Sequence, residues 1–196
     1  MIGVILAGGE NSRMGSDKAF LEVEGKPLIE HILAVHGSLF TQTIIVTRTP
    51  QIFRSYPVVV AEDAFDIRGP LTGIYSGIRS SCEDLHFVSA CDMPYLNVPL
   101  ITYLQDQVGD YDAVVPRIQG LSEPLHAIYH RRLLPVMESF LKNGERKIQR
   151  LFDGANVRFV AEDEIDRFDP RHRSFVNINT PEEYKEVVCS DWACRN

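Results

Sequence analysis

Two glycines and two cations near the start of the chain could hold a phosphate group. Residues 2–7 are apolar or glycine, and Gly8 and Gly9 follow them directly. Glycine lets backbone N–H groups crowd around a phosphate without a clash from Cβ. Arg13 can fork two phosphate oxygens, and Lys18 can act as a point charge. An ordinary strand-to-helix turn would explain the glycine pair alone, but the two cations at fixed offsets favour phosphate binding.

A carboxylate that follows a later apolar run could bind a metal ion. Residues 85–90 predict a buried strand, and Cys91 and Asp92 come next, before Met93 and Pro94. Mg²⁺ usually takes one or two carboxylates together with substrate phosphates. Asp92 could instead cap the turn that follows it. The glycine-rich loop at the end of another strand favours the metal role, because ligands of such sheets lie at the carboxyl ends of the strands.

Acidic and amide side chains elsewhere could contact polar rings. A polar ring can present two N–H donors side by side, and one carboxylate can accept both hydrogen bonds. Asp63 and Asp66 are both candidates for this contact, and a solvated loop aspartate is the alternative for either. Asn177 and Asn179 are expected on one face of a strand end, since side chains alternate along a strand. Such paired amides could hold a polar ring or a second metal position, and their alternative role is to cap a helix.

Three glycines recur every four residues on one predicted helix face. They are Gly69, Gly73 and Gly77. The missing side chains let another group approach the helix backbone closely. A ligand or a neighbouring strand could use this space at Gly69 and Gly73, whereas Gly77 is expected to serve packing.

These residues lie at the ends of alternating strands and helices. Short apolar runs predict strands, and apolar residues at helical spacing predict helices. The expected strands are residues 2–7, 43–47, 58–61, 85–90, 111–115, 125–129, 157–160 and 175–178. The expected helices are residues 27–39, 70–79, 99–108 and 132–141, with a last one starting at the capping box Thr180-Pro181-Glu182-Glu183. Residues 117–124 are expected to form a surface loop.

The alternation predicts an α/β fold and a single domain over residues 1–196. Fully apolar strands need cover on both faces, which indicates a three-layer sandwich. We therefore expect a Rossmann-like, mostly parallel sheet with helices on both faces. The carboxyl-end rule then nominates three ligand-binding segments: Gly8 onward, residues 63–69, and residues 91–94.

Composition and charge exclude several function classes. The 196 residues carry 20 Lys and Arg against 27 Asp and Glu, a formal charge of −7. This charge argues against sequence-independent binding of nucleic acid or of a membrane surface. No apolar run approaches the roughly 18 residues of a membrane span, and no basic region precedes the short apolar start, so we expect a cytoplasmic protein. The cysteines include no Cys-x-x-Cys pair and are expected to be reduced, although Cys189 and Cys194 could close a small loop under oxidation.

The motifs together resemble a known family. Leu-Ala-Gly-Gly at 6–9 and Arg-Met-Gly-Ser-Asp-Lys at 13–18 form a loop typical of nucleotidyltransferases that join a nucleotide to a phosphorylated acceptor. Further matches are Gly-Pro-Leu-Thr-Gly at 69–73, Cys-Asp-Met-Pro at 91–94, Pro-Leu-His-Ala at 124–127 and Asn-Ile-Asn-Thr-Pro at 177–181. They span nearly the whole chain in the family order. The chain is most similar to the molybdenum cofactor guanylyltransferases of the MobA type.

The resemblance implies a nucleotide-diphospho-sugar-transferase-like fold and transfer of GMP from Mg²⁺-bound GTP to molybdenum-bearing molybdopterin, with release of pyrophosphate. Transient contacts with other cofactor-assembly proteins also fit the resemblance. It implies catalytic roles for Arg13, Lys18 and Asp92, with Asp92 as metal ligand, and acceptor binding by Asn177 and Asn179. The residues expected to contact GTP are Leu6, Ala7, Gly8, Gly9, Lys18, Asp66, Gly69, Gly73 and Asp92.

Two other functions stay open at this point. A cytidylyl- or uridylyltransferase acting on another acceptor would share the fold and differ in the base-reading residues at 46–48 and 63–69. A nucleotide-binding module without catalysis would need no metal carboxylate. The presence of both Lys18 and Asp92 therefore argues against the second alternative.

Overall fold

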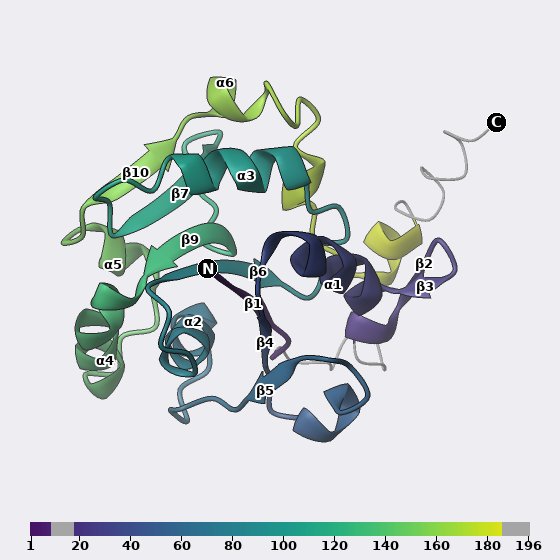
Figure 1. The fold of residues 1–196 in the computed structure, drawn as a ribbon, viewed down its shortest axis with the longest axis horizontal. Coiled ribbons are helices and arrows are strands. Elements are labelled where there is room, and N and C mark those ends of the chain that lie inside the picture. The colour runs from purple at the N-terminus through teal and green to yellow at the C-terminus, as the bar shows by residue number, and fades with distance from the viewer. Residues whose placement is uncertain (9–17, 186–196) are drawn as a thin grey trace.

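The computed structural model describes residues 1–8 and 18–185, which form a central sheet covered by helices (Figure 1). The strands are β1 (Ile2–Leu6), β2 (Glu22–Val23), β3 (Lys26–Pro27), β4 (Thr43–Val46), β5 (Val59–Ala61), β6 (Leu85–Ala90), β7 (Ala113–Ile118), β8 (Leu121–Ser122), β9 (His126–His130) and β10 (Val157–Val160). The α-helices are α1 (Leu28–Leu39), α2 (Pro70–Arg79), α3 (Val98–Asp106), α4 (Leu134–Lys142), α5 (Gln149–Phe152) and α6 (Glu162–Ile165).

Short helical segments complete the described chain. The 3-10 helices are η2 (Lys18–Phe20), η3 (Pro50–Phe53), η4 (Arg131–Leu133) and η5 (Arg173–Phe175). Residues 181–185 are helical, as the capping box before them predicts. Within the described residues, no helix combines the length and the apolar character that crossing a membrane requires.

The main sheet has eight strands and is mostly parallel at its centre. Its order is β10-β7-β9-β6-β1-β4-β5, with β8 paired to β7. β1 runs parallel to both β4 and β6, whereas β9 is antiparallel to its neighbours β6 and β7. Leu6 pairs with Val46 on one side and with Ala90 on the other. The three central strands therefore end at the same level, and the loops that leave them start side by side.

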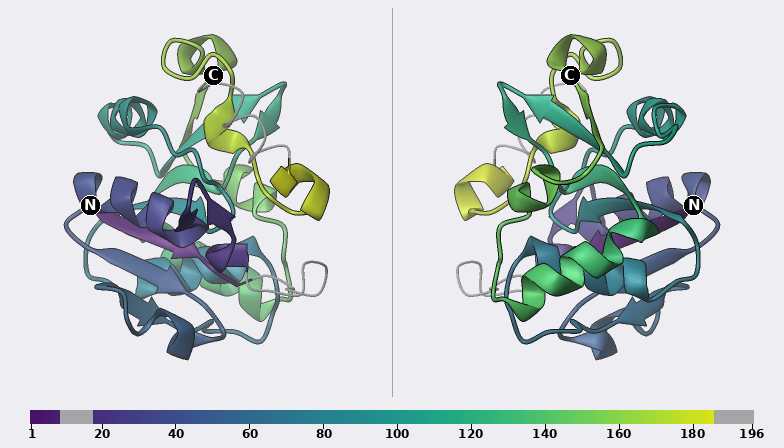
Figure 2. Two further views of the ribbon diagram at one scale, coloured as in Figure 1. Left: turned by 90° about the vertical axis from the view of Figure 1, so that its right-hand side faces the viewer. Right: turned by 90° about the vertical axis from the view of Figure 1, so that its left-hand side faces the viewer.

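Helices cover both faces of this sheet (Figures 1 and 2). On one face, Ile5 of β1 packs in a core with Ile29 of α1 and with residues of α3. On the other face, Val4 of β1 packs in a core with Ile74 of α2 and with residues of α4. Neighbouring residues of β1 thus point into opposite cores, as the alternation of a strand requires. The prediction of a three-layer α/β sandwich is confirmed.

Helix α2 lies close against β1 because the residues that face the strand are glycines. A Cβ added at Gly77 would overlap the Cγ1 atom of Val4, and one added at Gly73 would lie 3.1 Å from Leu6 Cδ1. Gly77 therefore serves packing, as its place on the predicted helix face indicates. A Cβ added at Gly37 of α1, by contrast, would have no atom within 4 Å among those of the described residues outside its own stretch of helix.

Three histidines are buried in the core, and we refer to His36, His86 and His126 as the buried histidines. The Nε2 atom of His36 lies 3.0 Å from Ser89 Oγ, and that of His86 lies 2.6 Å from Ser81 Oγ. Burial lowers the pKa of His36 and His126 to about 3 and that of His86 to about 4. All three rings are therefore neutral at pH 7 and act as packed polar side chains.

The strand predicted at residues 175–178 is wrong. This segment begins with the end of η5 and continues as irregular chain. The backbone N–H groups of Phe175 and Val176 close turns onto carbonyl groups three residues earlier, so they are not available to a neighbouring strand.

Two short hairpins also depart from the predictions. Residues 117–124, expected as a loop, contain the end of β7 and the paired strand β8. β2 and β3 form a second hairpin that the sequence did not indicate. Both turns have two residues with positive φ, Gln119-Gly120 and Glu24-Gly25, which is the geometry of a two-residue type I′ turn. A non-glycine residue at the first turn position hides this signal in the sequence.

Candidate active site

The carboxyl ends of β1, β4 and β6 open into one cleft of about 1030 Å³. Hydrogen bonds between neighbouring strands continue to the strand ends, from Ala7 N to Val46 O at 2.8 Å and from Cys91 N to Leu6 O at 3.1 Å. Ligands of open α/β sheets bind at this edge. The residues that line the cleft are Leu6, Ala7, Gly8, Lys18, Val46, Arg48, Thr49, Asp63, Arg68, Gly69, Pro70, Gly73, Ala90, Cys91, Asp92, Leu125, Asn177 and Asn179.

A lysine, an aspartate and an asparagine from three distant segments meet in this cleft. Lys18 Nζ donates a hydrogen bond of 2.7 Å to Asn179 Oδ1 and lies 3.5 Å from Asp92 Oδ2. The side chains of Lys18 and Asp92 are only 19% and 18% exposed. The two side chains therefore form an ion pair that is largely shielded from water. It places a positive charge in the cleft beside a carboxylate that could bind a metal ion.

The segment that carries Asn179 is fixed by its own hydrogen bonds. Glu183 accepts hydrogen bonds from the backbone N–H groups of Asn179, at 2.6 Å, and Thr180, at 3.0 Å. Thr180 Oγ1 accepts in return from the Glu183 N–H at 3.1 Å, so the predicted capping box is formed. Ile178 is buried, and its N–H donates to the carbonyl of Asp92 at 3.0 Å. Asn179 therefore meets Lys18 from a segment tied directly to the loop of the carboxylate.

The charge balance around Asp92 favours additional positive charge. Burial raises the pKa of the Asp92 carboxyl group, and the nearby Lys18 ammonium acts in the opposite direction without cancelling the effect. In the ligand-free protein, the Lys18 charge therefore offsets only part of the desolvation cost of the ionised Asp92 carboxylate. Among the described residues, no cluster of three or more His, Cys, Asp or Glu side chains is suited to a metal ion.

The other end of the cleft is formed by the segment before α2 and by the residues after β4. Arg48 Nε donates to Asp63 Oδ2 at 3.0 Å, and its Nη2 lies 3.9 Å from Asp66 Oδ1. Asp63 lines the cleft, whereas the Asp66 side chain is fully exposed and lies outside the cleft lining. Gly69, at the start of α2, has a φ of +151°, which side chains rarely adopt.

The structure brings together most of the residues that the sequence nominated. Asp66 is the described exception, and Gly9 and Arg13 lie outside the described residues, as do Cys189 and Cys194. The nominated residues that line the cleft are Leu6, Ala7, Gly8, Lys18, Asp63, Gly69, Gly73, Asp92, Asn177 and Asn179. Arg48 was named only as part of the base-reading segment 46–48, and Thr49 was not nominated, although its place shortly after a strand end was a usable signal.

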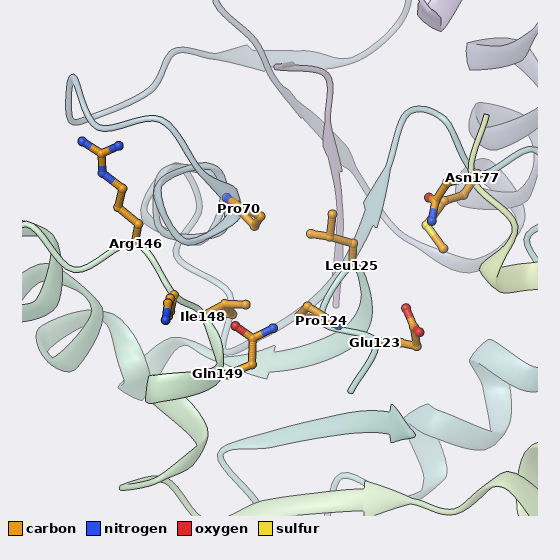
Figure 3. Close-up of a pocket in the computed structure, with 10 residues that line it drawn as sticks. Pro70, Glu123, Pro124, Leu125, Arg146, Ile148, Gln149 and Asn177 are labelled. Carbon is orange, nitrogen blue, oxygen red and sulfur yellow. The ribbon is translucent and has the colours of Figure 1, made fainter. Parts of the chain in front are cut away.

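A second, smaller pocket of about 310 Å³ adjoins the cleft. Pro70, Leu125 and Asn177 line both cavities. The rest of its lining comes from two segments far apart in the chain, which were not nominated, together with the residue after Asp92, which lies in the nominated segment 91–94 (Figure 3). These further residues are Met93, Glu123, Pro124, Arg146, Lys147, Ile148 and Gln149.

Comparisons with known proteins give one consistent result. Residues 3–160 match the family model of the MobA-like NTP transferase domain. A molybdenum cofactor guanylyltransferase of Desulfosudis oleivorans is 38% identical over 187 residues, which cover 94% of this chain and 93% of that protein. One of Syntrophotalea carbinolica is 35% identical over 185 residues, covering 93% of this chain and 88% of that protein.

A solved structure agrees with these sequence matches. The crystal structure of molybdopterin-guanine dinucleotide biosynthesis protein A from Archaeoglobus fulgidus superposes with a TM-score of 0.85 at 28% identity. The match covers 97% of this chain and all of the other.

Proposed function

The chain belongs to the family of MobA-like NTP transferase domains, and on that premise we propose that it transfers GMP from GTP to molybdenum-bearing molybdopterin. A phosphate oxygen of the acceptor attacks the α-phosphorus of GTP. The bond between the α-phosphorus and the oxygen bridging to the β-phosphate breaks, and pyrophosphate leaves. The observation that carries this proposal is the cluster of Lys18, Asp92 and Asn179 in a nucleotide-sized cleft that adjoins a second pocket.

The reaction needs no strong general base from the protein. The second pKa of a phosphate monoester is near 6, so the acceptor phosphate is mostly dianionic at pH 7. Catalysis then consists of alignment and of charge stabilisation on the leaving pyrophosphate. Lys18 supplies a positive charge for this purpose, and Asn179 holds its ammonium group in place at 2.7 Å. The backbone of Gly8, which lines the cleft, and the Arg13 side chain are proposed to share the phosphate contacts.

A divalent cation is expected for a nucleotidyltransferase of this family, and we propose Mg²⁺. Asp92 would hold it, since its carboxylate is a hard oxygen donor in the cleft and is under-compensated by Lys18 alone. One carboxylate suffices, because Mg²⁺ commonly completes its coordination with phosphate oxygens and waters. When bound, the cation neutralises negative charge on the triphosphate.

The guanine base is assigned to the end of the cleft near the start of α2. Asp63 is engaged with Arg48 at 3.0 Å, whereas Asp66 is 3.9 Å from the same guanidinium and fully exposed. We therefore assign Asp66 to the paired N–H donors of guanine and Asp63 to the positioning of Arg48. Asn177 and Asn179 are assigned to the acceptor, because Asn177 lines both cavities and Asn179 holds Lys18.

We place the reaction in the cytoplasm, where its nucleotide substrate is made and used. The substrates on this proposal are GTP and molybdopterin. The formal charge of −7 fits small-molecule substrates better than nucleic acid.

A melting experiment with the four nucleoside triphosphates tests the nucleotide half of this proposal. GTP with Mg²⁺ should raise the melting temperature much more than ATP, CTP or UTP. A ligand at about 100 times its Kd adds roughly 2.7 kcal/mol of stability, which such a melt resolves. An equal or larger shift with CTP would instead favour a cytidylyltransferase.

A matched pair of lysine variants tests the catalytic half. Lys18→Met removes the charge beside Asp92 and should lower turnover about 10²–10³-fold, as the loss of one preorganised charge contact does. Lys26→Met removes an exposed charge on β3 and should leave turnover unchanged. Equal effects of the two substitutions would contradict the assigned role of Lys18.

A further inference from the structure

The smaller pocket contains a carboxylate that forms no ion pair with any of the described residues. Glu123 lies between β8 and β9 and lines this pocket. Its side chain is half-buried, and no ion pair or hydrogen bond of its carboxylate is found among the described residues. Burial raises the pKa of this carboxyl group. The carboxylate is therefore partly desolvated and has unused capacity to accept hydrogen bonds.

The cations of the pocket do not neutralise Glu123. Figure 3 shows Arg146 and Glu123 well apart across the pocket, with the guanidinium of Arg146 directed away from Glu123. Glu145 fixes the cationic segment locally, because its carboxylate accepts the N–H groups of Arg146 at 2.8 Å and of Lys147 at 2.9 Å. The pocket thus has a cationic end and a separate acidic end.

The walls between these ends suit a flat ring. Pro70, Pro124, Leu125 and Ile148 supply apolar surface, and the volume of about 310 Å³ lies at the lower end of small-ligand pockets. A ring in this pocket would need polar contacts at few points. Glu123 offers two acceptor oxygens from one side, which matches two neighbouring N–H donors on the ring.

We propose that Glu123 binds the pyrimidine edge of the acceptor's pterin ring and so determines the specificity for the acceptor. A pterin carries a ring N–H next to an amino group, and one carboxylate can accept a hydrogen bond from each. This inference rests on the proposed function, which makes a pterin the acceptor.

The position of the pocket agrees with this role. Asn177 and Leu125 line both the pocket and the cleft, and Met93, the residue after Asp92, lines the pocket. One acceptor molecule can therefore place its phosphate near Asp92 and its ring against Glu123. Glu123 contacts the substrate away from the reacting atoms, so it affects the choice of acceptor and not the chemical step.

Two ring analogues test the proposal directly on the full chain. Pterin carries the amino group, whereas lumazine has a carbonyl in its place and is otherwise the same size. Wild-type protein should bind pterin at least about 10-fold more tightly than lumazine, because lumazine turns one donor into an acceptor facing the carboxylate. Titrations followed by the ring's own fluorescence give both dissociation constants.

Glu123→Gln is the decisive variant, because its amide keeps one acceptor and gains one donor. It should weaken pterin binding about 10–100-fold and abolish or reverse the preference over lumazine. Since the carboxylate has no described partner, the variant should melt at or above the wild-type temperature. Glu138→Gln, which removes an exposed charge on α4, is the matched control and should behave as wild type.

The outcomes separate this inference from the proposed function. Equal binding of the two rings by wild type, no pterin binding up to millimolar concentration, or an unchanged preference in Glu123→Gln each overturns the role of Glu123. In the transfer reaction, Glu123→Gln should raise the KM for the acceptor about 10-fold or more and leave kcat and the KM for GTP unchanged. A pterin preference lost in the variant, together with no GMP transfer by wild type, would instead refute the proposed function alone.

Discussion

Asp92→Asn should stabilise the ligand-free protein at pH 7 while it removes most of the transfer activity. Burial raises the folded-state pKa of Asp92 above the unfolded value. A carboxyl group with a raised folded pKa contributes its full stability below the unfolded pKa and loses it as the pH rises through the folded pKa. At pH 7 the ionised side chain therefore lowers the free energy of unfolding, and a neutral amide of the same shape removes this effect.

The magnitude follows from the ion pair with Lys18. Two unit charges 3.5 Å apart attract each other by about 5 kcal/mol at an effective dielectric constant of about 20. The pKa of Asp92 is nevertheless raised, so the desolvation of the carboxylate outweighs this attraction. The gain in the free energy of unfolding of Asp92→Asn is therefore small, because it is the difference between the desolvation cost of the carboxylate and its attraction to Lys18. The activity loss should be large, about 10²–10³-fold, since no other acidic side chain among the described residues pairs with Lys18.

Thermal melts at pH 7 and a transfer assay measure both effects. Without ligand, Asp92→Asn should melt at or above the wild-type temperature, and GTP with Mg²⁺ should shift the wild type more than the variant. Asp84→Asn, an exposed position next to the other end of β6, should change neither quantity. A variant that melts well below wild type, or one that keeps transfer within about threefold, would refute the reasoning.

Three further predictions follow from packing, protonation and base recognition. Gly77→Ala should destabilise the fold by about 1–3 kcal/mol in urea unfolding, because the new Cβ overlaps Val4. The control Gly37→Ala should stabilise the fold by up to about 1 kcal/mol. Equal effects of the two substitutions would contradict the close contact between α2 and β1. The buried histidines, with pKa values lowered to between about 3 and about 4, bind protons more readily when unfolded, so the free energy of unfolding should fall as the pH drops below about 6.5; a flat profile between pH 7 and pH 5 would be incompatible with neutral burial. Asp66→Asn should weaken GTP binding about 10-fold and Asp63→Asn less, as measured by calorimetry, and the reverse ranking would assign the base contact to Asp63.

The sequence predicted those strands and helices that form because of a local pattern of residues. The strands at 85–90 and 157–160 and the helix at 70–79 have the predicted bounds, because an apolar run and a proline at the first helical turn are sufficient signals. The expected strand at 175–178 is absent because backbone N–H groups there close local turns. Strand propensity could not reveal that competition. The single-domain organisation and the role of each site residue stay predictions.

The site itself could be predicted where one strand end determines it. Lys18 and Asp92 each come after a buried strand, and the register of β1 with β6 places the ends of these two strands side by side. In the structure the two side chains lie 3.5 Å apart. The smaller pocket could not be predicted in this way. Its walls join segments around Pro70, Glu123 and Ile148, and their meeting depends on how helices and loops pack above the sheet.

The most direct measurement is a transfer reaction with GTP labelled at either its α- or its γ-phosphate, with molybdopterin and Mg²⁺ present. We expect the α-label to enter a guanine dinucleotide product and the γ-label to be released in pyrophosphate, in equal amounts. When CTP labelled at its α-phosphate replaces GTP, its label should not enter the product. Release of GDP and inorganic phosphate, or equal labelling of the acceptor from CTP, would contradict GMP transfer by this chain.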